Sequence, residues 1–144
     1  MEATITNTAV ITANVVTPIT VRETINAEEQ SLLTITKSVS PVPVTENGTL
    51  TYTFVIQNLG NTAATEETGV VITDTFNPVL KNLTATFNGT AWTEGADYTY
   101  DEITGMFASV AGKITVPAAT YTQDTTTGAW GINPGVSTLV ISGT

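Results

Sequence analysis

Three residues with reactive or hydrogen-bonding side chains stand in otherwise apolar rows of the sequence. Lys37, Asp74 and Asn7 are each flanked, two positions to either side, by apolar residues. Alternate residues of a strand share a face, so each polar group is expected to point into the interior. Burying such groups without partners costs roughly 2–7 kcal/mol each. The pattern therefore predicts a buried Lys37–Asp74 ion pair with Asn7 hydrogen-bonding nearby.

A second interpretation gives the same three residues a chemical role. A lysine desolvated by apolar neighbours can lose its proton and become a nucleophile, and a buried, protonated aspartic acid can polarise an amide. Lys37 would then attack the Asn7 carboxamide beside Asp74, with Asp74 as the catalytic acid, and an isopeptide bond would join two strands. The sequence leaves the ion pair and the covalent bond open as alternatives.

The composition excludes most other chemistry. The 144 residues include four Lys and Arg, thirteen Asp and Glu, no His and no Cys, and the formal net charge is −9. So few cations make nucleic acids and anionic membranes poor partners, and the usual thiol nucleophiles, general bases and zinc ligands are lacking. We therefore expect no enzyme activity, no metal and no cofactor. No membrane span and no signal peptide are visible.

The same composition predicts an all-β chain. Only 12% of the residues are charged, about half the usual share, and threonine, which suits the solvent face of a strand, is abundant. Alternating apolar runs and the absence of a helical period indicate an immunoglobulin-like antiparallel β-sandwich. The predicted strands are 3–16, 19–25, 32–39, 49–58, 69–76, 82–92 and 136–144, with a polar linker at 26–31.

Two predicted hairpin turns share one pattern. The segments YDEITGMF (100–107) and QDTTTGAW (123–130) both read Asp-x-x-Thr-Gly-x-aromatic. The aspartate side chain can start such a turn, and the glycine supplies a positive φ. Asp97, Asp101 and Glu102 lie close together, but they lack the ligand spacing of a calcium loop, and we interpret them as solvated turn acids.

Residues 33 to about 80 resemble a known family. The stretches LTITKSVSP (33–41), GTLTYTFVIQNLGNTAAT (48–65) and GVVITDTF (69–76) are similar to the Ig-like conserved-repeat domain found in tandem arrays on bacterial surface and fimbrial proteins. In that family a closing strand resembling I-x-N-T-A-x-V follows a strand resembling PGVSTLVISGT. Here the latter ends the sequence, and ITNTAVI stands at residues 5–11 instead. The covalent chemistry suggested above resembles isopeptide formation in Gram-positive pilin domains.

The resemblance implies a permuted domain. It divides the chain into an N-terminal arm, residues 1–31, and a sandwich, residues 32–144, that lacks its last strand. An uncovered groove and an unpaired edge are rarely left open in β proteins. The expected donor strand presents Ile5, Asn7, Ala9, Ile11 and Ala13. The expected acceptor groove is formed by Val136, Leu139, Val140 and Ile141.

Two functions follow from where the arm binds. If the arm of one copy fills the groove of the next, the contact is head-to-tail and builds a filament. The chain would then be a structural subunit of a bacterial surface or spore-associated fibre, located outside the cell, with identical subunits as partners. If the arm folds back into its own groove, the chain would be a monomeric surface adhesin. We expect the fibre, and residues 15–32 leave both routes open.

Overall fold

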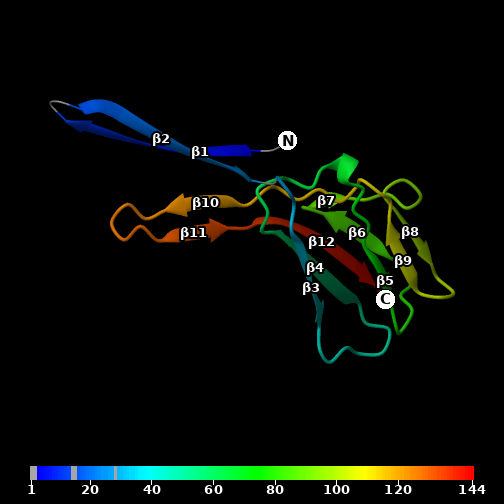
Figure 1. Ribbon diagram of the computed structural model, residues 1–144. Helices are drawn as coiled ribbons and strands as arrows, with labels where there is room; N and C mark the ends of the chain where they lie inside the picture. Colours follow the sequence, from blue (N-terminus) through cyan, green and yellow to red (C-terminus); the bar gives the residue numbers. More distant parts are fainter. Residues whose placement is uncertain (1–2, 14–15, 28) are drawn as a thin grey trace. The chain divides into compact units, whose positions relative to one another are not determined.

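The computed structural model describes residues 3–13, 16–27 and 29–144, and these residues form an all-β protein (Figure 1). The predicted fold class is confirmed at that level. Positions 14–15 of the predicted donor strand and position 28 of the predicted linker lie outside the described residues. The strands are β1 (Ala3–Ala13), β2 (Val16–Ala27), β3 (Leu33–Ser40), β4 (Leu50–Asn58), β5 (Thr73–Thr75), β6 (Thr84–Phe87), β7 (Thr90–Ala91), β8 (Tyr98–Asp101), β9 (Met106–Ser109), β10 (Thr120–Gln123), β11 (Trp130–Asn133) and β12 (Gly135–Gly143), with one 3₁₀ turn, η1 (Glu66–Thr68).

The chain divides into two compact units, Met1–Gln30 and Ser31–Thr144. In the first unit β1 and β2 pair antiparallel as a two-stranded ribbon, with Ile5 opposite Ile25 and Ala9 opposite Val21. The predicted strand 19–25 is therefore longer than expected and begins before Pro18. Pro18 is tolerated because the ladder register shifts between Ile11 and Ala13, and proline is accommodated at such irregularities.

Two sheets of the second unit share one core. One sheet has the strand order β3-β4-β12-β6-β7 and the other has the order β5-β9-β8. Alternate residues of β4 and β12 point into the core, because both strands are central and have small or apolar residues at most of the inward positions. The largest fully buried side chains come from both sheets and from their connections: Phe76, Phe107, Leu80, Ile114, Leu139, Ile141 and Val116.

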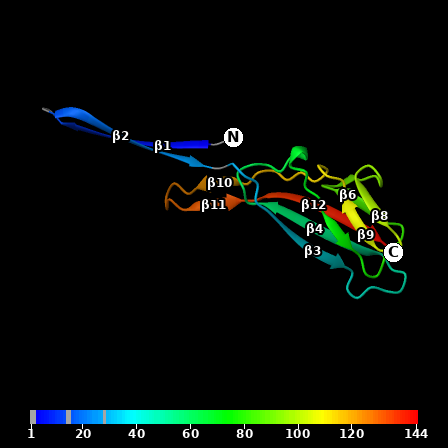
Figure 2. The same ribbon diagram turned by 45° about the vertical axis from the view of Figure 1, so that its right-hand side comes forward.

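A second two-stranded ribbon, β10–β11, extends from the end of the five-stranded sheet at which β3 begins (Figure 2). Tyr121 stands opposite Ile132, and Gln123 stands opposite Trp130, so these residues share one face. Every residue of both strands is exposed. The sequence predicted the hairpin turn but not that its apolar face would remain uncovered.

The two predicted turns form as expected. Asp101 Oδ1 accepts hydrogen bonds from the backbone N–H of Ile103 at 2.8 Å and of Thr104 at 3.4 Å. Asp124 Oδ1 does the same for Thr126 at 2.7 Å and Thr127 at 3.0 Å. Gly105 and Gly128 have φ values of 76° and 73°, which only glycine adopts without a steric cost.

Substituting these two glycines separates the cost of the backbone conformation from the cost of packing. A Cβ on Gly128 would meet nothing within 4 Å, whereas a Cβ on Gly105 would lie 2.4 Å from the Phe76 carbonyl oxygen. We expect Gly128→Ala to lower the free energy of unfolding by about 1 kcal/mol, and Gly105→Ala by about 1–3 kcal/mol more. Urea unfolding measures both, and equal losses would contradict the predicted clash.

Candidate functional site

The inner-face row of β3 is uncovered. Ile35 stands opposite Ile56 and Val39 stands opposite Tyr52, so all four residues share the inner face of the five-stranded sheet. The two β4 residues are 3% and 9% exposed, whereas Ile35 and Val39 are 51% and 39% exposed. β3 and β5 are both edge strands of their sheets, so within residues 31–144 no strand lies over this row.

A groove of about 310 Å³ lies between β3 and the segment that leads into β5. Among the described strands β5 pairs only with β9, so its other edge has no strand partner. We call the inner row of β3 (Leu33, Ile35, Lys37 and Val39) together with residues 70–75 the open edge. Unpaired apolar edges of this kind are sites of strand addition. The apolar residues of the groove are Leu33, Ile35, Ile56, Val70, Val71 and Ile72.

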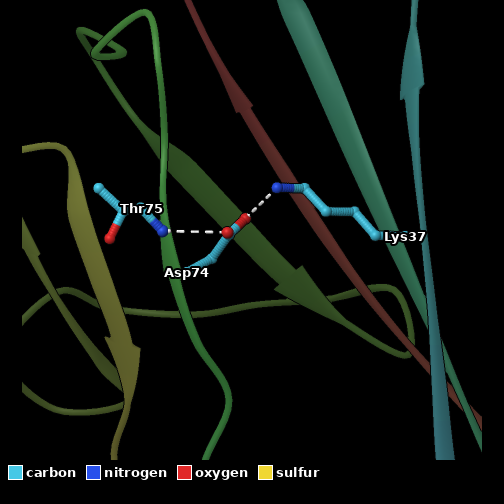
Figure 3. Close-up of polar contacts among 3 residues, drawn as sticks. All are labelled: Lys37, Asp74 and Thr75. Atoms are coloured by element: carbon cyan, nitrogen blue, oxygen red, sulfur yellow. Dashed lines mark hydrogen bonds and ion pairs between the residues drawn. The ribbon is translucent and has the colours of Figure 1, made fainter.

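Lys37 and Asp74 form an ion pair across the open edge (Figure 3). Lys37 Nζ contacts Asp74 Oδ2, and Asp74 Oδ1 accepts a hydrogen bond from the Thr75 backbone N–H at 3.0 Å. The predicted pairing of these two residues is confirmed, but the prediction that they are buried is wrong. Their side chains are 39% and 19% exposed because β3 is uncovered.

The Lys37 ammonium also lies over aromatic rings. Its Nζ is 4.8 Å from the ring centroid of Tyr52, 5.3 Å from that of Phe76 and 5.6 Å from that of Phe54. Aromatic faces attract cations at such distances. These rings and Asp74 therefore hold the ammonium at one place on the open edge.

Asn7, the third residue of the predicted cluster, lies in β1 opposite Glu23. Its side chain, like those of Ile5, Ile11 and Ala13, lies outside what the structure describes. Ala9, the remaining residue of the predicted donor row, is exposed, and Val10 is 56% exposed. The structure therefore pairs β1 with β2 and leaves the meeting of Asn7 with Lys37 and Asp74 as a prediction.

The predicted acceptor groove at Val136, Leu139, Val140 and Ile141 is wrong. These residues belong to β12, which pairs with β4 on one side and with β6 on the other. Leu139 and Ile141 are 0% exposed in the core, while Val136 is 45% exposed. A central strand offers no backbone edge to a partner. The unpaired edges of the two sheets lie instead at β3 and β5.

Asn58 is a buried polar residue that the sequence reasoning did not single out. It is 0% exposed, and its Oδ1 accepts hydrogen bonds at 2.9 Å from the backbone N–H of Leu32 and of Gly60. Its Nδ2 donates to the carbonyl oxygens of Thr62 at 2.7 Å and Pro117 at 3.0 Å. The sequence signal that could have identified Asn58 is the segment NLG (58–60) at the end of an apolar strand. Asn58 thus fixes the start of β3 to the end of β4.

Asp97 belongs to a surface turn. The backbone N–H of Thr93 donates to its Oδ2 at 2.9 Å, and Lys113 Nζ lies 3.0 Å from its Oδ1. The Thr93 hydrogen bond and then Lys113 hold the pKa of Asp97 below its ordinary value of 3.8. Backbone hydrogen bonds, with Ile103 foremost, likewise lower the pKa of Asp101. Among the described residues no group of three acidic, His or Cys side chains is placed to hold a metal ion.

These lowered pKa values predict a pH dependence of stability. A carboxyl group whose pKa is lower in the folded protein stabilises the fold above its unfolded pKa, and the contribution is lost as the pH falls through the folded pKa. We expect the urea midpoint to be constant from about pH 7 to pH 5 and to fall below about pH 4. The fall should be smaller for Asp97→Asn, and an unchanged pH profile in that variant would contradict the assignment.

Comparisons of the chain with protein-family models, with curated proteins and with solved structures give no match. No helix in the described parts of the chain is both long and apolar enough to span a bilayer. What the geometry itself defines is an all-β protein of two packed sheets with one uncovered apolar edge. An ion pair is held at that edge, and the chain carries two separate two-stranded ribbons.

Proposed function

We propose that the chain is the structural subunit of a self-assembling bacterial surface or spore-associated fibre. Its sandwich is of the immunoglobulin-like type, and its copies join head to tail by donor-strand complementation. The observation that carries the proposal is the open edge, where apolar residues of an inner face are half exposed beside an unpaired strand. A strand added to β5 would cover the row on β3.

The donor is β1 of a second copy. In its own unit β1 has only β2 as a partner, and an isolated two-stranded sheet is marginally stable in water. The apolar positions of β1 alternate as those of the open edge do, with Asn7 and Lys37 each as the polar interruption. In the register we propose, Asn7 lies beside Lys37 and Asp74. Because donor and acceptor surfaces differ, the contact does not close on itself and propagates as a filament.

The same register would permit a covalent bond between copies. Deprotonated Lys37 Nζ would attack Asn7 Cγ, forming a C–N bond, while the Cγ–Nδ2 bond breaks and ammonia leaves. Asp74, in its protonated form, would polarise the amide and donate its proton to the departing Nδ2, and its carboxylate would then take up the proton released by Lys37 Nζ. Filaments boiled in detergent would then resist dissociation, and intact mass would fall by one ammonia for each bond formed. Complete dissociation to monomers without this mass loss would contradict the covalent bond and support the noncovalent ion pair of Lys37 and Asp74.

Negative-stain microscopy and light scattering of full-length protein test the assembly itself. We expect filaments from the native chain, and at least tenfold less polymer from Ile35→Lys, which places a charge in the open edge. The matched control is Thr36→Lys, since Thr36 is exposed on the outer face of the same strand and its substitution should leave assembly unchanged. A stable monomer from the native chain would overturn the fibre and favour the adhesin with a folded-back arm.

A further inference from the structure

The β10–β11 ribbon has an apolar face without a cover. Trp130 is 67% exposed, Ile132 is 53% exposed and Tyr121 is 44% exposed, and the register places all three on one face. Together they expose on the order of 300 Å² of largely apolar surface. A patch of that size indicates an interaction site, yet it is smaller than the roughly 800 Å² that each partner buries in a specific interface. The ribbon therefore needs a neighbouring surface to form one.

That neighbouring surface is the open edge. The Tyr121 hydroxyl donates a hydrogen bond of 2.6 Å to the Leu59 carbonyl oxygen, and the Leu59 N–H donates to the Leu32 carbonyl oxygen at 2.9 Å. Leu32, itself 52% exposed, directly precedes β3. Both views show the ribbon leaving the sheet where β3 begins (Figures 1 and 2). Tyr121 is thus connected through Leu59 to the residue that directly precedes β3, and the ribbon begins beside the open edge.

The N-terminal ribbon is longer than β3. β1 has eleven residues and β2 has twelve, whereas β3 has eight and β10 has four. In the antiparallel register that places Asn7 beside Lys37, Ile11 lies beside Leu33, and Ala13 extends two residues, about 7 Å, beyond the start of β3. The part of the donor that extends toward β10–β11 is therefore the end of the ribbon where Ala13 pairs with Val16.

Both ribbons are amphipathic in the same way. In β1–β2 the register pairs Ile11 with Ile19 and Ala9 with Val21 at alternate positions, and the intervening pairs are mostly polar. In β10–β11 the alternate pairs of the opposite face are Thr120 with Asn133 and Thr122 with Gly131. Two such ribbons bury their apolar positions by packing face to face. Neither ribbon can do so within its own two strands.

We infer that β10–β11 is the second half of the acceptor and binds the end of the β1–β2 ribbon of a second copy at which Ala13 pairs with Val16, so that each contact spans the open edge and this ribbon together. The inference rests on the proposed function, since it takes β1 as the donor to the open edge. It goes further by assigning a binding role to Trp130 and Ile132.

Disulfide trapping between two full-length chains of different size tests the inference, because the chain has no native Cys. One chain carries Ala13→Cys, and the other carries Ile132→Cys or, as the control on the opposite ribbon face, Thr122→Cys. A second pairing, Ala9→Cys with Ile35→Cys, reports on the open edge alone. We expect the 13–132 heterodimer at a yield at least tenfold above 13–122, together with the 9–35 heterodimer.

The outcomes separate the two proposals. A 9–35 heterodimer with 13–132 no stronger than 13–122 overturns the ribbon assignment and leaves donation to the open edge intact. Absence of both heterodimers overturns donation itself, and with it the ribbon assignment. As an independent measure, Trp130→Ser should raise the concentration needed for assembly about tenfold. Ile103→Ser, at a residue that is 89% exposed, should not change it, and equal effects of the two substitutions would overturn the inference.

Discussion

Replacing Asn58 with leucine is expected to lower the free energy of unfolding by about 3–5 kcal/mol. The leucine side chain has the same branching but is larger, and it makes none of the four hydrogen bonds of the amide. The N–H groups of Leu32 and Gly60 and the carbonyl oxygens of Thr62 and Pro117 lose their partner. Each polar group left unsatisfied in a buried site costs about 1–3 kcal/mol, although water entry near the surface reduces the total.

Urea unfolding of Asn58→Leu beside Gln57→Leu measures this effect. Gln57 is the preceding residue and is exposed on the outer row of β4, so its substitution should change the free energy by less than about 0.5 kcal/mol. Amide hydrogen exchange at Leu32 and Gly60 should accelerate in Asn58→Leu alone. A loss below about 1 kcal/mol would show that the four partners are satisfied without the amide.

Asn58 also has a consequence for assembly. It holds Leu32, which precedes β3, and Pro117, which precedes β10, to the same end of β4. The hydrogen bonds of Asn58 therefore hold the segments that lead into β3 and into β10 beside each other. If both halves form one acceptor, loosening these hydrogen bonds should weaken assembly even at urea concentrations where the sheets remain folded.

The second large effect is expected for Phe76→Ala, which should cost about 3–5 kcal/mol. Phe76 is 1% exposed, and its ring centroid lies 4.7 Å from that of Tyr52, 6.2 Å from that of Tyr100 and 6.4 Å from that of Phe107. Truncation would leave a cavity among rings that come from both sheets. Lys37 would also lose one of the rings beneath its ammonium.

The control for this prediction is Ile103→Ala, because Ile103 is 89% exposed at a hairpin turn. It removes apolar atoms from the surface and should cost less than about 0.5 kcal/mol. Phe76→Leu should fall between the two, since it fills part of the space. Near-ultraviolet circular dichroism should lose intensity in Phe76→Ala as the packing with Tyr52 is removed. A cost similar to that of Ile103→Ala would mean that the rings repack without a cavity.

The pairing of Lys37 with Asp74 shows how far the alternation rule extends. Each residue was placed on an inner face because every second neighbour is apolar, and the two side chains do meet. Their partial exposure could not be predicted, because it depends on which strand lies over β3. The residue pattern predicts which face of a strand a side chain lies on. Whether that face is shielded from solvent depends on strands that are distant in the sequence.

The sequence alone determined the all-β class, the inner-face positions of Lys37 and Asp74, and the two Asp-x-x-Thr-Gly turns, since alternation and turn chemistry act over a few residues. Only the tertiary structure decided the strand neighbours: β12 between β4 and β6, β1 with β2, and β3 and β5 at open edges. Such pairings join residues far apart in the chain, and the same threonine-rich, alternating strands are compatible with several orders. For that reason the predicted acceptor was placed on a central strand, and the uncovered edge emerged only from the fold.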